Sequence, residues 1–197
     1  LDFYVYEEVL KQIRNWVELG LDIVPVSINL SRCHAENKNL YDEIMGLTKK
    51  YNIAPKYIEF EITESAFTHN AQYLIEVLTK FREYGFNISM DDFGAGYSFL
   101  NALYEIPVNI LKLDKGFLKP SEVSAKQREI IKQVVVLAKN IDLNIVCEGV
   151  ETKEQAEFLL GIGCDMAQGY FYAKPMPLED LKHYLNNQKV KQQLSKS

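Results

Sequence analysis

The sequence predicts an α/β fold, a TIM-like (β/α)8 barrel whose N-terminal strands are missing from this chain. Helix-like and strand-like hydrophobic patterns alternate through its 197 residues, and a helix pattern follows each of six strand patterns. Such alternation is typical of parallel strands joined by right-handed crossovers. A barrel needs eight strands and roughly 250 residues, and residues 1–6 already resemble part of a helix, so roughly 50 residues and two strands are expected ahead of Leu1.

Local signals support each element in turn. Apolar residues at helical spacing between 6 and 17 stop at Gly20, and those between 74 and 81 stop at Gly85. Thr152 with Gln155 forms a capping-box pattern, and Pro177 suits the first position of a last helix. Further helices are expected near 40–50, 98–104 and 130–138. The strands are expected at 23–30, 57–63, 86–90, 109–113, 143–147 and 165–172.

A doubly wound open sheet is the alternative architecture. Its usual glycine-rich phosphate-binding turn after the first strand is absent from this sequence, which favours the barrel. No internal repeat or low-complexity linker is visible. The expected organisation is therefore one barrel domain over 1–185, followed by a polar tail over 186–197.

Composition and charge narrow the function. Hydrophobic residues make up 47% of the chain and charged residues 25%, which is ordinary for a globular domain. The net charge of −5 argues against a nucleic acid polymer as the main partner. No apolar run approaches the roughly 18 residues of a membrane span, so no membrane segment is expected in this chain. The three cysteines lack metal-binding spacing and suit a reducing, cytoplasmic compartment.

Polar residues recur on one face of the predicted strands, near their carboxyl ends. Side chains alternate between two faces along a strand, so Glu59 and Glu61 lie on the face opposite Phe60. The polar residues at or near successive strand ends are Asn29, Glu61, Asp91, Lys112 and Glu148. Barrel enzymes place their chemistry at this end of the strands. Glu59 lies deeper on its strand and is expected to be structural.

The expected cluster is strongly acidic. Its carboxylates are Glu61, Glu64, Asp91, Asp92, Glu148 and Glu151, and Lys112 is its single cation. So many like charges in a cleft need protons or cations among them. The donors are all oxygens, including the amides of Asn29 and Gln168, and this set suits hard cations such as Mg²⁺, Mn²⁺ or Ca²⁺.

The pattern also indicates a reaction type. The three histidines fall outside the strand ends, which argues against zinc. Asp91 and Asp92 could place one carboxylate inward and its neighbour at the rim, as a bridge between two metal ions. A two-metal site suggests hydrolysis or transfer at phosphorus.

Each of these residues also has a structural interpretation. A strand-end acid is often a helix cap or a surface charge, and Lys112 alone would be an ion-pair partner. Recurrence on the same face and at the same end of successive strands favours a site instead. A barrel enzyme that uses Lys112 as a Schiff base is a further alternative, but it leaves the carboxylates unused. The aromatic residues 170–172 are expected in the core rather than in a base-stacking platform.

Six ordered motifs carry a family resemblance. They are SINLS at 27–31, EITES at 61–65, DDFGAGYS at 91–98, LKLD at 111–114, EGVET at 148–152 and QGY at 168–170. At these residues the sequence resembles the EAL domain family, the bacterial phosphodiesterases that hydrolyse cyclic di-GMP. The resemblance runs from about residue 1 to 185.

The resemblance implies a TIM-like barrel whose strand ends hold two divalent cations, Mg²⁺ or Mn²⁺. The residues that match the family's metal ligands are Asn29, Glu61, Asp91, Asp92 and Glu148. Lys112 would contact the attacking water or the phosphate, and Glu148 and Gln168 would complete the metal and water shell. Glu64 would brace the loop at 93–98, and Glu151 would support the site from behind. The product would be linear pGpG.

The Glu-Ala-Leu motif that names the family is not in this chain, and its glutamate is a metal ligand in the family. We expect it in the segment ahead of Leu1, with an arginine that grips the substrate. If the parent protein lacks that glutamate, the alternative is a catalytically inactive cyclic di-GMP receptor or protein-interaction module. The resemblance further implies a homodimer formed near the loop at 92–98, and a parent chain with a sensory or GGDEF domain and, in some cases, a membrane anchor.

Overall fold

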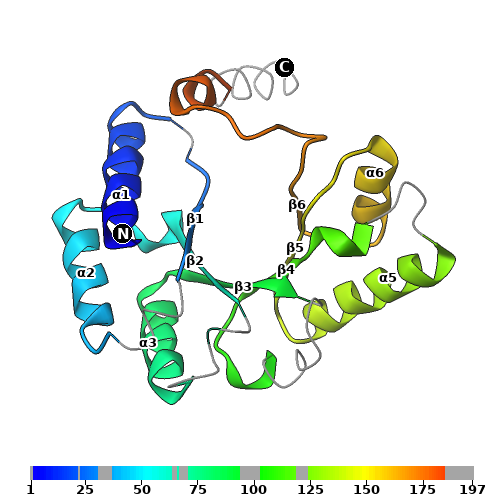
Figure 1. Ribbon diagram of the computed structural model, residues 1–197, viewed down its shortest axis with the longest axis horizontal. Coiled ribbons are helices and arrows are strands. Elements are labelled where there is room, and N and C mark those ends of the chain that lie inside the picture. The colour runs from blue at the N-terminus through cyan, green and yellow to red at the C-terminus, as the bar shows by residue number, and fades with distance from the viewer. Residues whose placement is uncertain are drawn as a thin grey trace.

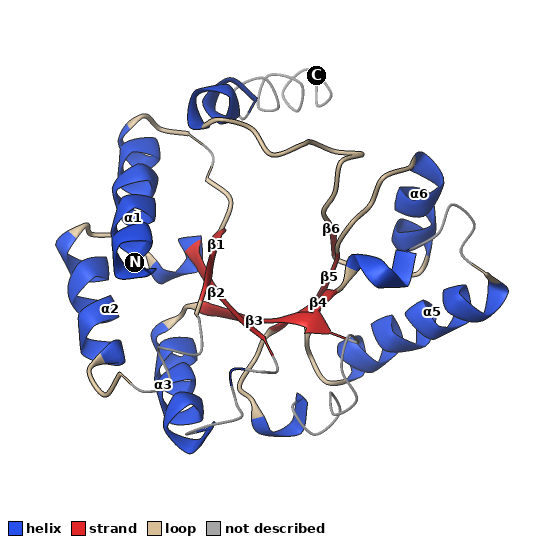
Figure 2. Cartoon of the chain, in the orientation of Figure 1, coloured by secondary structure: helices blue, strands red, loops and turns tan. Residues whose placement is uncertain are grey.

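The computed structural model describes residues 2–21, 23–30, 37–63, 66, 71–93, 103–118 and 124–184. Within these residues six parallel strands form one sheet in chain order, from β1 at one edge to β6 at the other. The sheet curves into an arc with helices on its convex side (Figures 1 and 2). This is the arrangement of a TIM-like barrel. The unbroken strand order excludes the doubly wound alternative, in which the order reverses at a switch point.

All six expected strands are present. They are β1 (Val26–Asn29), β2 (Ile58–Thr63), β3 (Asn87–Phe93), β4 (Ile110–Leu113), β5 (Asn144–Cys147) and β6 (Met166–Ala167). The last strand is much shorter than the expected 165–172. The α-helices are α1 (Asp2–Glu18), α2 (Leu40–Lys50), α3 (Ala71–Tyr84), α5 (Ala125–Asn140) and α6 (Lys153–Gly161), with short 3₁₀ helices η2 (Pro55–Tyr57) and η4 (Lys115–Leu118).

Two expected helices are described only in part. Residues 103–105 are helical, while the rest of the helix expected at 98–104 lies outside the described residues. The last helix follows Pro177 as expected, and residues 178–184 are helical. The Leu181 amide donates to the Pro177 carbonyl oxygen at 3.1 Å. The tail at 186–197 also lies outside the described residues.

Helices α5 and α6 each begin with a capping box. At α6 the predicted capping box is confirmed: Thr152 Oγ1 accepts from the Gln155 amide at 3.3 Å, and Gln155 Oε1 accepts from the Thr152 amide at 3.0 Å. Helix α5 begins at Ala125, well before the expected 130. Ser124 and Gln127 form a second capping box there, and apolar periodicity alone does not reveal it.

The main hydrophobic core lies between the sheet and its helices. Phe60, in the middle of β2, is fully buried, and its ring centroid lies 5.0 Å from that of Phe81 on α3 and 5.2 Å from that of Phe86. On α1, Leu10 and Ile13 are also fully buried. The apolar face of each strand is therefore the convex face, which the helices cover.

The aromatic segment after β6 does not join this core. Tyr170, Phe171 and Tyr172 are 60%, 42% and 47% exposed, so the expectation that they are core residues is wrong. The strand stops at Ala167, and the chain then turns, with the Tyr172 amide donating to the Gly169 carbonyl oxygen at 3.0 Å. This turn carries the three rings past the edge of the sheet.

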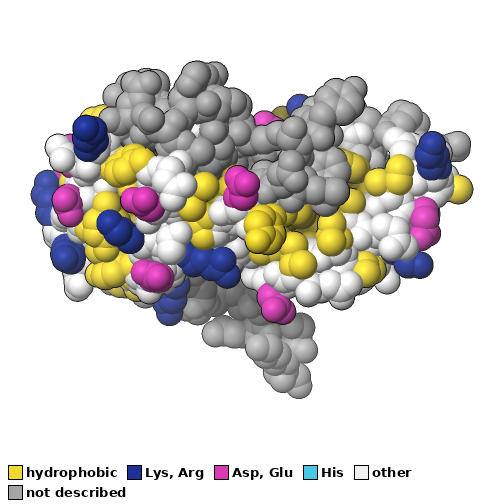
Figure 3. Space-filling model, turned by 90° about the horizontal axis from the view of Figure 1, so that it is seen from below, with side chains coloured by type: hydrophobic (Ala, Val, Ile, Leu, Met, Phe, Trp, Pro, Cys, Tyr) yellow, Lys and Arg dark blue, Asp and Glu magenta, His cyan; other side chains and the backbone are white. Residues whose placement is uncertain are grey.

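The outer surface is mixed in character. Figure 3 shows the underside of the molecule, where apolar side chains alternate with charges of both signs. Across the described part of the chain, no helix has both the length and the apolar character needed to cross a bilayer.

Candidate active site

Strand register brings the predicted site residues together on the concave face of the sheet, which we call the lumen face. Asn29 on β1 pairs with Glu61 on β2, and Glu61 pairs in turn with Ser89 on β3. Paired residues of parallel strands point to the same face. The lumen face thus carries Asn29, Glu61, Ser89, Asp91, Lys112 and Glu148, together with the apolar Ile110 and Val146.

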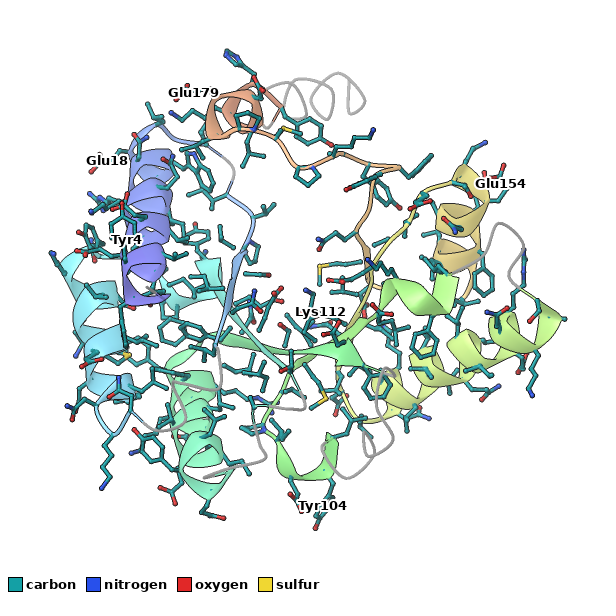
Figure 4. All side chains as sticks on the ribbon, in the orientation of Figure 1. Tyr4, Glu18, Tyr104, Lys112, Glu154 and Glu179 are labelled. Atoms are coloured by element: carbon teal, nitrogen blue, oxygen red, sulfur yellow. The ribbon has the colours of Figure 1, made fainter. Side chains whose placement is uncertain are left out.

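Lys112 is the centre of this face. Its Nζ lies 2.6 Å from Glu61 Oε1, 2.7 Å from Glu148 Oε1 and 3.6 Å from Asp91 Oδ1. The lysine is 5% exposed, and Figure 4 shows it pointing into the hollow of the arc. Its three partners come from β2, β3 and the end of β5, so one ammonium group links carboxylates from three separate strands.

The ammonium form of Lys112 is strongly favoured. Burial by itself lowers the pKa of Lys112, but the hydrogen bonds to Glu148 and Glu61 and the negative charge of Asp91 outweigh it. The net result is a pKa above the ordinary value for lysine. Lys112 therefore stays protonated at neutral pH and presents a fixed positive charge to the lumen.

A β-bulge at the end of β3 directs the two aspartates differently. Met90 pairs with Leu111, but the next pair is Phe93 with Leu113, so β3 carries an extra residue at this point. Asp92 takes a φ of 56°, in the left-handed region that L-residues seldom adopt. Asp91 turns toward Lys112 and also accepts a hydrogen bond from the Asp92 amide at 2.9 Å, whereas Asp92 is exposed at the rim.

The surroundings of Asp92 disfavour its charged form. Partial burial raises the pKa of Asp92, and the charges of Asp91 and Asp114 raise it further. Lys112 acts in the opposite direction but does not cancel these effects. A cation bound beside Asp92 would relieve this repulsion, because it would offset the same charges.

The ends of β5 and β6 are joined by backbone hydrogen bonds. The Gln168 amide donates to the Cys147 carbonyl oxygen at 2.9 Å, and the Val150 amide donates to the Gln168 carbonyl oxygen at 3.0 Å. Gly169 packs so closely on Val150 that a Cβ atom there would overlap the Val150 backbone. This close approach fixes the segment that carries Glu148 beside the one that carries Gln168.

The other predicted site residues lie around this centre. Asn29 is exposed on the edge strand β1, and Gln168 is exposed just beyond β6. Glu151 is also exposed, and its amide donates to Gln155 Oε1 at 2.7 Å as part of the α6 cap. Glu64 and most of the loop at 93–98 lie outside the described residues.

The donor set fits a hard divalent cation in its chemistry. Its described members are carboxylates and the amides of Asn29 and Gln168, at or just beyond the strand ends, and Mg²⁺ and Mn²⁺ prefer such oxygen ligands. No group of three or more His, Cys, Asp or Glu among the described residues already has metal-binding geometry. The Lys112 ammonium instead supplies the positive charge between Glu61 and Glu148.

Two further lumen residues are Ser89, to which the sequence assigns no role, and Glu59, which the sequence predicts to be structural. Ser89 is fully buried and Glu59 is 7% exposed, and both belong to the strands that carry the site. Strand alternation already places them on the polar face, but their position beneath the strand ends gave no chemical signal. Their burial shows in addition that neither residue lies at an open surface.

Comparisons with known proteins agree with this geometry. The chain matches the EAL domain family over residues 1–175 and belongs to that family. It is 32% identical over 185 residues to the cyclic di-GMP phosphodiesterase NbdA of Pseudomonas aeruginosa, covering 94% of this chain and 24% of that protein. The chain spans about a quarter of the length of the first curated relatives that it matches.

Solved structures share the fold. The PaMucR phosphodiesterase in complex with c-di-GMP superposes with a TM-score of 0.82 at 34% identity, covering 91% of this chain and 72% of that one. The EAL domain of Mycobacterium smegmatis DcpA gives a TM-score of 0.88 at 30% identity, covering 95% and 84%. The expected fold class and family are thereby confirmed.

Proposed function

We propose that the protein containing this domain hydrolyses cyclic di-GMP to linear pGpG, with two divalent cations, Mg²⁺ or Mn²⁺, as cofactors. The observation that carries the proposal is the buried Lys112 ammonium, held among Glu61, Asp91 and Glu148 at the carboxyl ends of the strands. Relatives named cyclic di-GMP phosphodiesterases and the c-di-GMP complex of a structural neighbour support the choice of substrate.

In this proposal the strand-end oxygens hold the cations, through Asn29, Glu61, Asp91, Asp92 and Glu148. When bound, such cations polarise a phosphoryl oxygen and lower the pKa of a water molecule. Lys112 keeps its proton and offers a hydrogen bond and a full charge to the phosphate as negative charge develops on it. Glu148 forms an ion pair with Lys112 through Oε1 and would orient the attacking water with its other carboxylate oxygen.

The remaining predicted residues act around this centre. Gln168 would contact the substrate or the water shell from the neighbouring strand end, and Glu151 would support Glu148 from behind. Glu64 would brace the loop that follows Asp92. These roles follow the motifs of the family.

A cyclic di-GMP receptor without turnover, or a protein-interaction module, is the second candidate. Lys112 offers a bound phosphate one fixed positive charge in the lumen without a metal ion, although it offsets only one of the two negative charges of Glu61 and Glu148. A Schiff-base mechanism is disfavoured, because that chemistry needs an unprotonated amine and Lys112 is held in its charged form.

The experiment uses the full-length protein and measures binding and turnover separately. We expect turnover of cyclic di-GMP to pGpG only with Mg²⁺ or Mn²⁺, and the same ions to raise the melting temperature by mass action. Asp91→Asn should remove most of the turnover and most of the metal-dependent rise in melting temperature. Asp165→Asn, which alters a surface ion pair with Lys139, should leave both quantities unchanged. Binding without turnover in any metal would establish the receptor, and absence of both binding and turnover would overturn the proposal.

A further inference from the structure

The contact between Lys112 and Glu61 spans an entire strand. Lys112 lies on β4 and Glu61 on β2, and both of these strands pair with β3 but not with each other. Neighbouring strands are about 4.8 Å apart, so β2 and β4 are separated by roughly 10 Å. The 2.6 Å contact between Nζ and Oε1 is therefore made over the lumen face of β3.

Ser89 lies on the lumen face of β3, the strand between the two that carry this contact. It pairs with Glu61 on one side and with Ile110 on the other, two residues before Lys112 on the same face of β4. Its side chain is 0% exposed although it points to the lumen rather than to the helix-covered core. Glu61, its partner on β2, and Lys112, two residues beyond its partner on β4, are also buried on this face.

The size of Ser89 matters more than its hydroxyl group. Among the residues that the structure describes, Ser89 Oγ has no hydrogen-bond partner, whereas Lys112 Nζ is engaged with Glu61, Asp91 and Glu148. The hydroxyl therefore contributes nothing to the network of Lys112. What this position supplies is a short side chain over which the lysine stem can pass.

We infer that Ser89 is a positioning residue, whose small side chain leaves the space in which Lys112 reaches across β3 to Glu61. A β-branched side chain here would occupy that space, because packed interiors do not absorb added methyl groups freely. Lys112 would then be turned away from Glu61 and toward Glu148 alone. The catalytic consequence of this displacement rests on the function proposed above.

Steady-state kinetics of the full-length protein test the catalytic consequence. Ser89→Val should lower kcat for cyclic di-GMP at least about tenfold, with KM changed less than about threefold. Ser89→Ala, which adds no bulk, should keep the wild-type kcat. Ala138→Val places similar bulk at a fully buried position on α5, and it should lower the melting temperature without lowering kcat. Equal kcat in wild type and Ser89→Val would overturn the inference, whereas a wild type without turnover would overturn the proposed function instead.

A double-mutant cycle tests the crossing without any need for activity. Ser89→Val should lower the melting temperature when Lys112 is present, and should leave it unchanged or raise it in the Lys112→Ala background, where the space is free. The inference would also be supported if Ser89→Val folds only when it is combined with Lys112→Ala. If neither Ser89→Val nor the double variant folds, the same cycle with Ser89→Thr in place of Ser89→Val tests the inference. Equal shifts in the two backgrounds would show that Lys112 does not pass over Ser89.

Discussion

The two faces of strand β2 are both buried, yet they are stabilised in opposite ways. On β2, Phe60 on the convex face is 0% exposed and Glu61 on the lumen face is 8% exposed. Phe60 is surrounded by aromatic rings and needs no particular partner. Glu61 needs the opposite charge of Lys112, because a carboxylate removed from water without a partner is strongly destabilising. Burial alone therefore does not distinguish the core from the site, and the nature of the neighbours does.

This difference separates stability from chemistry along a single strand. Apolar packing on the convex face tolerates any neighbour of suitable volume, whereas the lumen face depends on a few charged contacts between specific atoms. Substitutions on the convex face should change the free energy of unfolding. Substitutions on the lumen face should change turnover, and those that leave Glu61 without Lys112 should lower the free energy of unfolding as well.

The largest expected effect is at Phe60. Phe60→Ala should lower the free energy of unfolding by about 3–5 kcal/mol, because it leaves a cavity among Phe81, Phe86 and Tyr6. Urea denaturation measures the loss. Phe171→Ala removes the same ring from an exposed position and should cost less than about 1 kcal/mol. Equal losses in the two variants would contradict the assignment of the core to the convex face.

The next effect is at Lys112. Lys112→Met keeps an unbranched apolar stem but removes the charge, so kcat for cyclic di-GMP should fall about a hundredfold, or about 2.7 kcal/mol, with a smaller change in substrate affinity. Kinetics and isothermal titration on the same preparation separate the two quantities. Lys139→Met, which removes a surface cation paired with Asp165, is the matched control and should keep the wild-type kcat. A loss of affinity as large as the loss of kcat would show that Lys112 only binds the substrate.

A smaller effect concerns the strained backbone at Asp92. Glycine adopts a positive φ without strain, so Asp92→Gly should stabilise the fold by up to about 1 kcal/mol while lowering turnover. Asn52→Gly and Asp142→Gly, at φ values of 50° and 57° away from the site, should stabilise similarly and leave turnover unchanged. Thermal unfolding and kinetics of the three variants make the comparison. Undiminished turnover in Asp92→Gly would remove this residue from the site.

The smallest effect is the pH dependence of the Asp165 contacts. Burial raises the pKa of Asp165, but hydrogen bonds from Lys139 and from the Ile145 amide outweigh it and hold the pKa below its ordinary value. Because the folded-state pKa is the lower one, this stabilisation is present above about pH 4 and is lost as the pH falls through the folded-state value. With a partly exposed pair it should amount to less than about 1 kcal/mol.

Chemical denaturation between neutral and acidic pH tests this last expectation. The difference in unfolding free energy between wild type and Asp165→Asn should be constant near neutral pH and should shrink below about pH 4. A difference that grows on acidification would mean that the pKa of Asp165 is raised rather than lowered.

The sequence by itself determined the order and type of the elements and the division of each strand into two faces. These features depend on local periodicity, which is visible in two or three neighbouring residues. The change from Phe60 to Glu61, for example, already distinguishes the core face of the strand from the lumen face. The capping box of Thr152 and Gln155 was predictable for the same reason, since all of its contacts lie within one turn of helix. The grouping of the carboxylates at the strand ends follows from the same alternation along each strand.

Only the tertiary structure decided which side chains meet. That Lys112 crosses β3 to reach Glu61, with Ser89 beneath, depends on strand order and register over 51 positions of sequence separation, which no local pattern encodes. The bulge that accompanies the positive φ of Asp92 and its exposure at the rim depends likewise on pairing between β3 and β4. The exposure of residues 170–172 follows from where β6 stops pairing with β5, since an apolar sequence is buried only if a neighbour is present to cover it.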